Sequence, residues 1–431
     1  MIPSANLSKM NNMKRILVIF LVGLLCMSIF VALTPKTEAQ QSTVDWWPTF
    51  HHDQSHLGSS TSTGPTTNTI LWTYVTGGAI DYSSPVVVDG VVYVASDDHY
   101  LYALNAANDA YIWSYKTGSK MDSSPAVDSG IVYVGSEDHK VYAINATTGT
   151  KIWSYTTGDQ VESSPAVVNG IVYVGSDDGK VYALNAQTGT KEWSYSTGNA
   201  VVSSPAVADG VVYVGSEDNN VYALSAASGT KIWSYTTGGS VDSSPTVWNG
   251  SVFIGSDDDS VYALSVQTGT RVWSFGTGDY VDSCPAVANG VVYIGSEDYN
   301  LYALNAETGS KIWSYNTGNQ VESSPAVSSG VVYVGSDDDN VYALDAATGT
   351  TIWTYGTVNL VDSSPAIANG VLYIGSDDNT VYAFGTITIP QPSPYAPPIP
   401  EFPTQTLALA ITLFTACSAF VLISVKKKRI N

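Results

Sequence analysis

The sequence SSPAVVNGIVYVGSDDGKVYALNAQTGTKEWSYSTGNAVV, residues 163–202, is the unit from which most of the chain is built. The same pattern recurs over residues 70–388 with small changes, and its Pro returns every 40 residues, as at Pro125 and Pro165. A fixed period of about 40 residues is typical of repeat proteins, in which each unit packs against its neighbours. The repeat therefore decides the fold before any local motif is considered.

Each copy of the unit contains four short runs of β-branched and aromatic residues, separated by turns of Gly, Asp and Asn. In one copy these runs are Ser124–Val127, Ile131–Gly135, Lys140–Asn145 and Lys151–Tyr155. Such runs, bounded by turn residues, predict strands joined by tight hairpins. Eight four-stranded units of this length predict an all-β, eight-bladed β-propeller over residues 69–388.

The ring is expected to close through its two ends. The last copy lacks its own Trp strand, whereas an unpaired Trp strand at Ile70–Val75 precedes the first copy. We expect the two to complete the eighth blade together, because this pairing leaves no open sheet edge. One Trp per blade should fill the gap to the next blade, since its large flat ring buries much apolar area. These predicted docking residues are Trp72, Trp113, Trp153, Trp193, Trp233, Trp273, Trp313 and Trp353.

The segment Ala183–Trp193, ALNAQTGTKEW, resembles the tryptophan-docking motif of the pyrroloquinoline-quinone (PQQ) repeat family, and Ala343–Trp353 matches it as well. The first copy departs from the motif, with Asn-Asp-Ala at 108–110 in place of Thr-Gly-Thr. The lead-in at 46–53, WWPTFHHD, also resembles the opening of many secreted propellers of this type. The resemblance implies the propeller fold and leaves function open, because the family spans dehydrogenases and non-catalytic assembly and binding proteins.

The two ends of the chain predict export and a membrane anchor. Residues 1–39 hold a basic pair, an apolar run and a small-residue site, which is typical of a signal-peptide helix; an uncleaved anchor is the alternative. Residues 405–425 are apolar and long enough to span a bilayer, and the basic tail at 426–431 should stay cytoplasmic. A lead-in segment at 40–68 precedes the propeller, and a Pro-rich tether at 389–404 follows it. We therefore expect the propeller to lie outside the cell, anchored to the cytoplasmic membrane.

The motif Pro400-Glu401-Phe402-Pro403 resembles archaeal PEF-type C-terminal sorting signals, because an apolar helix and a basic tail follow it in the same order. The resemblance implies an archaeal protein whose helix a sortase-like enzyme removes as it attaches the chain to a surface lipid. The alternative is a single-pass membrane protein that keeps its helix.

Acidic residues dominate the charge of the chain. Asp and Glu number 38 against 17 Lys and Arg, which gives a formal net charge of −21. Most acids fall in loops between second and third strands or between successive units, and in a propeller these loops share one face. Such a field repels nucleic acid and favours cations or basic partners. We therefore expect no nucleic-acid binding.

Doubled acids in the second-to-third loops are candidate Ca²⁺ ligands, because carboxylates of neighbouring loops could bridge a hard cation. The alternative is that Asp suits tight turns and that carboxylates keep a Tyr-rich surface soluble. The candidates are Asp97, Asp98, Glu137, Asp138, Asp177, Asp178, Glu217, Asp218, Asp257, Asp258, Glu297, Asp298, Asp337, Asp338, Asp377 and Asp378.

Histidines suggest two further metal hypotheses. His99 and His139 occupy the same loop offset in adjacent units and could bind a transition metal jointly. His51, His52 and His56 in the lead-in segment resemble a metal-binding cluster. The alternatives are exposed loop positions for the first pair and structural roles for the second group.

Quinoprotein dehydrogenases of the PQQ family hold PQQ over the channel with Ca²⁺ and, in many cases, a disulfide between adjacent Cys residues. This chain has no adjacent Cys pair, and its carboxylates recur in nearly every unit, whereas an asymmetric cofactor needs residues that break the symmetry. Few such residues are present; Cys284 replaces a Ser beside the presumed channel mouth, and Val202 interrupts the acidic position before Ser-Ser-Pro. We expect no catalytic residue and no PQQ, with Ca²⁺ left open.

These observations predict a monomeric, membrane-anchored propeller that acts as a non-catalytic binding or scaffold module for a surface protein or glycan. The first alternative is a PQQ-dependent dehydrogenase. The second is an envelope assembly factor resembling the propeller lipoprotein of the barrel-assembly machine.

Overall fold

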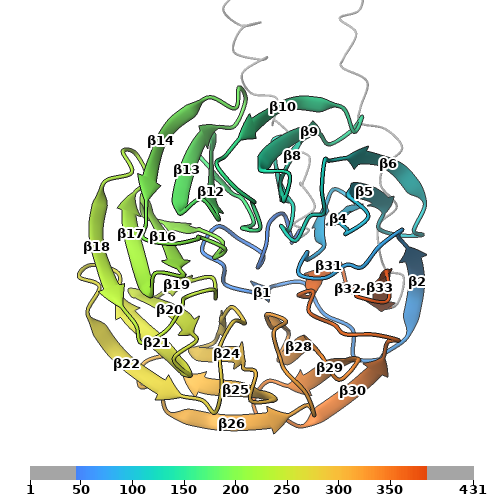
Figure 1. Ribbon diagram of the computed structural model, residues 1–431. Coiled ribbons are helices and arrows are strands. Elements are labelled where there is room, and N and C mark those ends of the chain that lie inside the picture. The colour runs from blue at the N-terminus through green and yellow to red at the C-terminus, as the bar shows by residue number, and fades with distance from the viewer. Residues whose placement is uncertain (1–44, 386–431) are drawn as a thin grey trace, which may run out of the picture. The chain divides into compact units, whose positions relative to one another are not determined.

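The computed structural model describes residues 45–385, which form a closed ring of eight β-sheets around a central channel (Figure 1). Each sheet contains one blade of four antiparallel strands, one sheet carries β1 (Ser59–Ser60) as an additional parallel strand, and the described residues contain no helix. The predicted all-β, eight-bladed propeller is confirmed. The signal peptide, tether, sorting signal and C-terminal helix predicted from the sequence lie outside the described residues. Between residues 45 and 385 there is no helix with the length and hydropathy of a membrane span.

The blades are numbered here along the chain. Blade 1 contains β3 (Val86–Val88), β4 (Val91–Ala95), β5 (Tyr100–Asn105) and β6 (Tyr111–Lys116), and blade 2 contains β7 (Ala126–Asp128), β8 (Ile131–Ser136), β9 (Lys140–Asn145) and β10 (Lys151–Thr156). Blade 3 contains β11 (Ala166–Val168), β12 (Ile171–Ser176), β13 (Lys180–Asn185) and β14 (Lys191–Ser196), and blade 4 contains β15 (Ala206–Ala208), β16 (Val211–Ser216), β17 (Asn220–Ser225) and β18 (Lys231–Thr236). Blade 5 contains β19 (Thr246–Trp248), β20 (Ser251–Ser256), β21 (Ser260–Ser265) and β22 (Arg271–Gly276), and blade 6 contains β23 (Ala286–Ala288), β24 (Val291–Gly295), β25 (Asn300–Asn305) and β26 (Lys311–Asn316). Blade 7 contains β27 (Ala326–Ser328), β28 (Val331–Ser336), β29 (Asn340–Asp345) and β30 (Thr351–Gly356), and blade 8 contains β31 (Ala366–Ala368), β32 (Val371–Ser376), β33 (Thr380–Gly385) and β2 (Ile70–Val75).

Blade 8 closes the ring as the sequence predicts. Its outer strand β2 comes from the start of the propeller and pairs antiparallel with β33, so that Trp72 lies opposite Ala383. The two ends of the propeller are thereby tied into one sheet.

The eight docking Trp residues lie between consecutive blades. Trp113 of blade 1 is buried, and its indole N–H donates to the carbonyl of Ala146 in blade 2 over 2.8 Å. Gly149 lies flat against this ring; a Cβ there would approach Trp113 to 2.8 Å, and the backbone has a φ of +68°. Glycine is therefore required in this turn, both for the close approach and for the left-handed backbone. At Trp353 the acceptor is the carbonyl of Pro65 instead.

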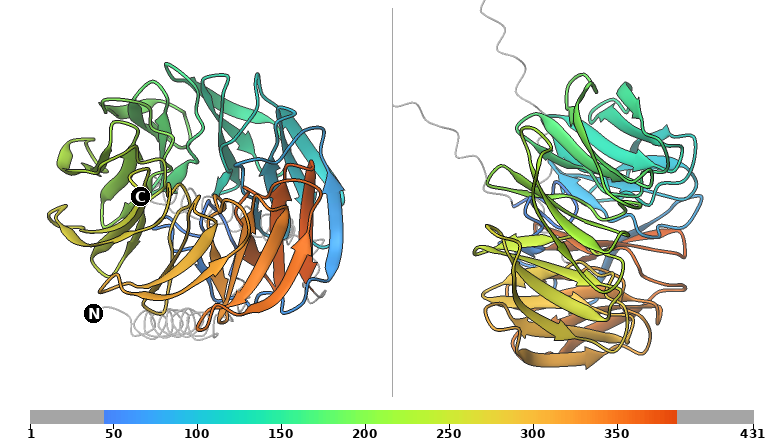
Figure 2. Two further views of the ribbon diagram at one scale, coloured as in Figure 1. Left: turned by 60° about the horizontal axis from the view of Figure 1, so that its bottom comes forward. Right: turned by 60° about the vertical axis from the view of Figure 1, so that its left-hand side comes forward.

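The lead-in segment, residues 45–68, runs around the inside of the channel and meets the inner strands of the blades in order. Figure 1 and Figure 2 show it within the ring, ahead of β2. Its short strand β1 (Ser59–Ser60) pairs parallel with β27. Further backbone contacts join Trp47 to Val87, Pro48 to Val127, Gln54 to Val207, Ser55 to Val247, Leu57 to Val287 and Gly58 to Val327. The segment thus satisfies the exposed edges of the inner strands and fills one end of the channel.

Candidate functional site

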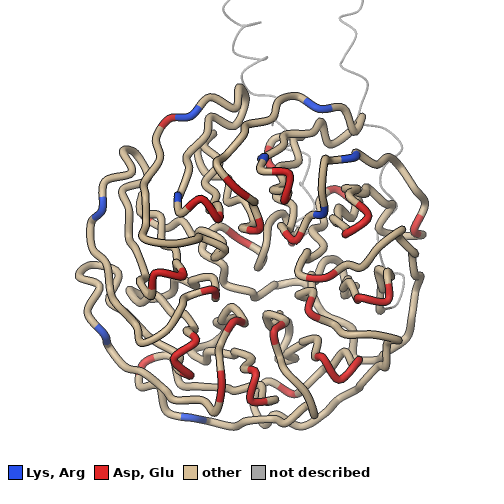
Figure 3. Tube along the Cα trace, viewed as in Figure 1, with Lys and Arg blue, Asp and Glu red and all other residues tan. Residues whose placement is uncertain are grey.

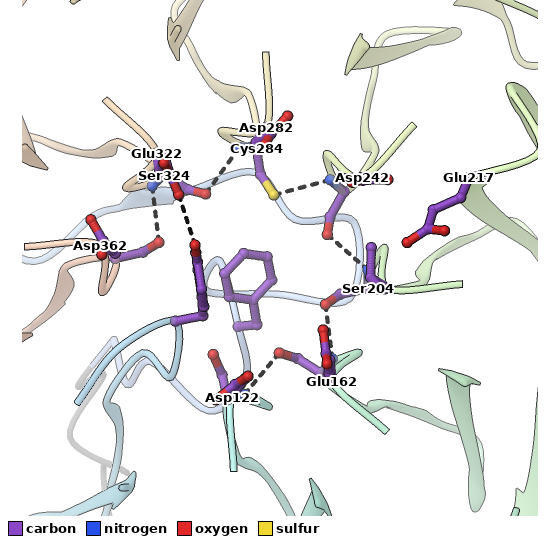
Figure 4. A pocket seen from close by; sticks show the side chains of 17 residues that line it. Asp122, Glu162, Ser204, Glu217, Asp242, Asp282, Cys284, Glu322, Ser324 and Asp362 are labelled. Carbon is purple, nitrogen blue, oxygen red and sulfur yellow. Dashed lines mark hydrogen bonds between the residues drawn. The ribbon is translucent and has the colours of Figure 1, made fainter. Parts of the chain in front are cut away.

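The other end of the channel opens into an acidic cavity. The residue before each Ser-Ser-Pro lies in the loop that enters the inner strand of a blade, so the repeat brings eight such residues to one rim. A cavity of about 310 Å³ lies within this rim, and its floor includes Phe50 of the lead-in segment. We call the rim the acidic mouth; it consists of Asp122, Glu162, Asp242, Asp282, Glu322 and Asp362, with Tyr82 and Val202 at the two remaining positions (Figure 4).

A belt of hydroxyl groups supports the acidic mouth from below. The backbone N–H of one residue donates to the side chain of its counterpart in the next blade, for example from Ser124 to Ser164 Oγ over 2.9 Å. The last link runs from Ser364 N to Ser84 Oγ and closes the circle. This serine belt comprises Ser84, Ser124, Ser164, Ser204, Ser244, Cys284, Ser324 and Ser364. The belt fixes the distance between neighbouring blades and hence the radius of the mouth.

Cys284 is a member of this belt. It is buried, and its Sγ accepts from the backbone N–H of Ser244 over 3.1 Å. Burial raises the pKa of its thiol. The cysteine therefore takes the place of a belt hydroxyl, as a neutral thiol.

Charge crowding raises the pKa values of the acidic mouth. Burial, followed by repulsion from neighbouring carboxylates, raises the pKa of Glu162, Asp242 and Glu322 to about 7. The same causes raise the pKa of Asp282 and Asp362 further, because each faces a second Asp. Within residues 45–385 the Oδ1 atoms of Asp122, Asp242, Asp282 and Asp362 are buried without a hydrogen-bond donor. The mouth is therefore an electrostatically unfavourable site that a bound cation would relieve.

Over the whole propeller, too, acidic residues lie near the channel and basic residues lie farther out. Figure 3 shows the acids gathered on loops around the channel, whereas most basic residues lie on the outer strands. Five of these basic residues begin the outer strands of blades 2 to 6: Lys151, Lys191, Lys231, Arg271 and Lys311. A cation approaching along the channel axis therefore meets carboxylates before it meets positive charge.

The doubled acids predicted as Ca²⁺ ligands divide into two groups. The second acid of each pair is held inside its own turn: Asp178 Oδ2 accepts from Tyr182 O–H over 2.5 Å and from Gly158 N–H over 2.9 Å. Although burial opposes it, the hydrogen bonds from Tyr182 and Lys180 hold the pKa of Asp178 below its usual range. The corresponding Tyr bonds reach Asp98, Asp138, Asp218, Asp258, Asp298, Asp338 and Asp378. These eight second acids stabilise the turns.

The first acid of each pair lies closer to other carboxylates. Burial and neighbouring acids raise the pKa of Asp177 and Asp377 to about 6. The remaining first acids are Asp97, Glu137, Glu217, Asp257, Glu297 and Asp337, of which Glu217 lines the cavity (Figure 4). Their role as Ca²⁺ ligands stays a prediction.

Two clusters bring three carboxylates together among the described residues. One consists of Asp122, Glu137 and Glu162, and the other of Asp81, Asp362 and Asp377; in each, one ligand atom from every residue lies within 4.8 Å of the others. The sequence suggests Glu137 and Asp377 as Ca²⁺ ligands. It does not predict that the other two acids of each cluster lie beside them. The available signal was that the loop before Ser-Ser-Pro and the second-to-third loop share one face.

Tyr82 breaks the eightfold pattern of the acidic mouth. It is the extra residue that lengthens the spacing from Trp72 to Pro85 by one relative to the next unit. Its side chain is 51% exposed, and its hydroxyl donates to Glu322 Oε2 over 3.0 Å, past the blade between them. Tyr82, Val202 and Cys284 all line the same cavity, so its eight sides are not equivalent.

The histidines of the lead-in segment are structural. His51 Nδ1 and Nε2 lie 2.9 Å and 3.0 Å from the carbonyls of His56 and Pro325, and His56 Nδ1 lies 3.1 Å from the carbonyl of Pro245. Burial lowers the pKa of His51 to about 4 and that of His56 to about 3. Phe50 stacks on His51 and meets His56 edge-on, which fixes the cavity floor. His52 Nε2 pairs with Asp45 instead.

His99 and His139 lie at the left-handed position of the second-to-third turn, with φ of 74° and 66°. Gly179 and Asn219 take the same conformation in the next two blades. Neither histidine belongs to a cluster of three metal-ligating side chains within the described part of the chain. Their shared position is therefore explained by the turn.

Comparisons with known proteins agree with this architecture. A profile of PQQ-type repeats, described as outer membrane protein assembly factor BamB, matches overlapping segments at 29–200, 141–241, 199–280, 228–322 and 257–388. A comparison with curated proteins found no significant match.

Solved structures share the fold at low sequence identity. BamB from Moraxella catarrhalis is 18% identical with a TM-score of 0.65, over 74% of this chain and 99% of that one. A europium-containing methanol dehydrogenase is 14% identical with a TM-score of 0.70, over 79% and 98%. A computationally designed protein, Ika8, is 17% identical with a TM-score of 0.67, over 74% and 99%. Because an assembly factor, an enzyme and a designed protein all share it, the fold does not decide the activity.

The resemblance of the docking motif to PQQ-type repeats thus holds for the whole propeller. Because the matched segments together cover most of the chain, the chain belongs to the family of repeat propellers described as outer membrane protein assembly factor BamB.

Proposed function

We propose that this propeller is a non-catalytic binding module outside the cell, which takes a cationic group of a protein partner into its acidic mouth. The observation that carries the proposal is the ring of six carboxylates around a cavity of about 310 Å³. A cavity of this size exceeds a bare metal ion and suits an ammonium or guanidinium group with its aliphatic stem. The ring of Phe50 at the floor offers such a group an aromatic surface.

The electrostatic potential of the acidic mouth favours a cationic ligand over a neutral or anionic one. The acids of the mouth hold raised pKa values because they are buried close together, so a positive charge entering the cavity would lower the free energy of several carboxylates at once. Lys120 already does this for Asp122 over 2.9 Å. A basic side chain of a partner would do the same for the rest of the ring. Complementary charge of this kind also speeds association.

The dehydrogenase alternative requires PQQ, and the cavity does not fit that cofactor. PQQ is a polycarboxylate, so the ring of carboxylates would repel it, and Lys120 is already engaged by Asp122 and Glu137. Cys284 is the free cysteine of the described residues and has a hydroxyl belt around it, with no adjacent Cys. We therefore assign no catalytic step to these residues.

Membership in the BamB family supports the second alternative, an assembly factor of the cell envelope. An assembly factor is also a binding module, so the two proposals differ in partner rather than in mechanism. The C-terminal helix predicted from the sequence favours a surface-anchored propeller over a lipoprotein. The expected location outside the cytoplasmic membrane rests on the sequence of the two ends, and a glycan partner remains the alternative to a protein.

Calorimetric titration of the full-length chain with an oligolysine peptide tests the proposal. We expect saturable binding that weakens with salt, because the contact is electrostatic. Combining Glu162→Gln with Asp242→Asn should weaken the binding by about tenfold or more, since a charge-assisted contact contributes roughly 1.5–3 kcal/mol. Glu307→Gln, an exposed change in the β25–β26 turn at the opposite end of the strands, is the control and should leave binding unchanged. Equal binding by all three proteins would contradict the proposal.

A further inference from the structure

The cluster of Asp81, Asp362 and Asp377 lies where the ring closes. Asp81 follows β2, the outer strand of blade 8, and leads into blade 1, whereas Asp362 precedes β31 and Asp377 lies in the turn between β32 and β33. One carboxylate oxygen from each residue lies within 4.8 Å of the other two. Three carboxylates at such distances repel one another unless a cation or protons lie between them.

Among the described residues no cation forms an ion pair with this cluster, although the more distant Lys120 slightly opposes the rise in the pKa of Asp81 that its burial causes. None of the salt bridges between residues 45 and 385 involves Asp81, Asp362 or Asp377. The side chain of Asp362 is 7% exposed, and it lines the acidic cavity. Its Oδ1 atom and that of Asp377 are buried without a hydrogen-bond donor in this part of the chain. Asp337 of the preceding blade also faces Asp362 and adds to the negative charge.

The equivalent cluster in blade 2 shows what such a cluster needs. It is built from the corresponding positions, Asp122 before Ser-Ser-Pro, Glu137 in the second-to-third turn and Glu162 before the next Ser-Ser-Pro, except that the inserted Tyr82 separates Asp81 from its own Ser-Ser-Pro. There Lys120 places its ammonium 2.9 Å from Asp122 and 3.2 Å from Glu137. One internal cation therefore bridges two of the three carboxylates.

Leu360 occupies the position of Lys120 in the cluster at the ring closure. The two residues correspond in the repeat, since Glu137 N–H donates to the carbonyl of Lys120 and Asp377 N–H donates to the carbonyl of Leu360. Leucine cannot neutralise the carboxylates. The same arrangement is thus present twice, once with its own cation and once without.

We propose that Asp81, Asp362 and Asp377 bind one Ca²⁺ ion, which takes the place that the Lys120 ammonium holds in blade 2. Carboxylate oxygens are hard ligands that suit Ca²⁺, whereas a transition metal would favour nitrogen or sulfur. Because the ligands come from both sides of the junction between blades 8 and 1, the ion clamps the ring where its two ends meet. The site shares Asp362 with the acidic mouth, whereas Asp81 and Asp377 do not line that cavity, so the site does not rest on the partner proposed above.

Two reciprocal substitutions, Leu360→Lys and Lys120→Leu, test the site. The full-length chain is stripped with chelator and titrated with Ca²⁺ by calorimetry, and its thermal unfolding is followed with and without the ion. The wild-type chain should bind one Ca²⁺ and unfold at a higher temperature with it. Leu360→Lys should abolish this binding, because its ammonium would fill the site, whereas Lys120→Leu should create a second Ca²⁺ site in blade 2.

Two further variants test whether Ca²⁺ binding depends on this cluster or on the overall negative charge of the chain. Asp362→Asn should weaken Ca²⁺ binding at least about tenfold, because affinity follows the number of charged ligands. Glu307→Gln removes one exposed carboxylate elsewhere and should bind Ca²⁺ like the wild type. Cooperative unfolding in chelator shows that each variant has folded.

The proposal is overturned if the folded wild-type chain binds no Ca²⁺, prefers Mg²⁺, or keeps its Ca²⁺ site in Leu360→Lys. None of these results bears on the binding of oligolysine by wild-type protein in chelator, so failure of the calcium site and failure of the proposed function can be told apart.

Discussion

Two rings of acidic residues surround the channel, and they differ in the partners that the fold gives them. The first ring consists of the second acid of each doubled pair. Each of these acids accepts a hydrogen bond from a Tyr hydroxyl and, in most blades, another from a backbone N–H, as Asp178 does from Tyr182 and Gly158. In the acidic mouth, Asp242 and Asp362 accept no such bond within the described region, and their Oδ1 atoms are buried without a donor, as is the Oδ1 of Asp178. Recurrence in every blade therefore does not mean a common role. Acids of the first ring stabilise turns, and acids of the second are available to a ligand.

Removing a turn acid should change the free energy of unfolding more than removing an acid of the mouth. Asp178→Ala leaves the Tyr182 hydroxyl and the Gly158 N–H without their acceptor, so we expect a loss of about 2 kcal/mol in the free energy of unfolding. Chemical denaturation measures this loss, with Glu307→Gln as the control. An unchanged free energy of unfolding would show that the turn acids are not structural.

The pH dependence of stability reports on the acidic mouth. Burial and mutual repulsion raise the pKa of Glu162, Asp242 and Glu322 to about 7, so between their ordinary values of 4.5 or 3.8 and pH 7 the folded chain holds more protons than the unfolded chain. Stability is then full below the ordinary pKa values and falls as the pH rises through about 7. In chelator, the melting temperature should be higher at about pH 5 than at about pH 8, and added salt should narrow the gap. A melting temperature that rises over this range would contradict the assignment.

A single neutral substitution in the mouth should have the smallest effect, with the opposite sign to that of the turn acid. Glu162→Gln removes one repelling charge, and because the side chain is partly solvated we expect a gain of up to about 1 kcal/mol at about pH 8. The gain should disappear at about pH 5, where Glu162 is largely protonated. Denaturation at both pH values measures the gain, and a loss at the higher pH would place Glu162 with the turn acids.

The fold was predictable from the sequence because one period governs the whole propeller. The Trp at a fixed place in each unit, the turn residues and the unpaired strand at 70–75 together predict eight blades and their closure. The path of the lead-in segment was not predictable, because its contacts with Val87 and Val327 join residues far apart without any repeat. Local pattern indicates strands, whereas contacts of this kind depend on the diameter of the channel.

The site was predictable only in part. The sequence indicates that acids gather on one face, and this follows from strand direction alone. It does not show that Asp377 meets Asp81 and Asp362, since that requires the tilt of neighbouring blades. Nor does it show that Tyr82, a single extra residue, reaches Glu322 past an intervening blade. Eightfold repetition hides these differences, because the same residue type stands at positions with different neighbours.

Calorimetric titration of the full-length chain with PQQ in the presence of Ca²⁺ tests most directly whether the acidic mouth is built for cations. The account predicts no saturable heat from PQQ, because the ring of carboxylates repels a polycarboxylate. Saturable binding of one PQQ per chain would contradict it and would restore the dehydrogenase as the leading proposal.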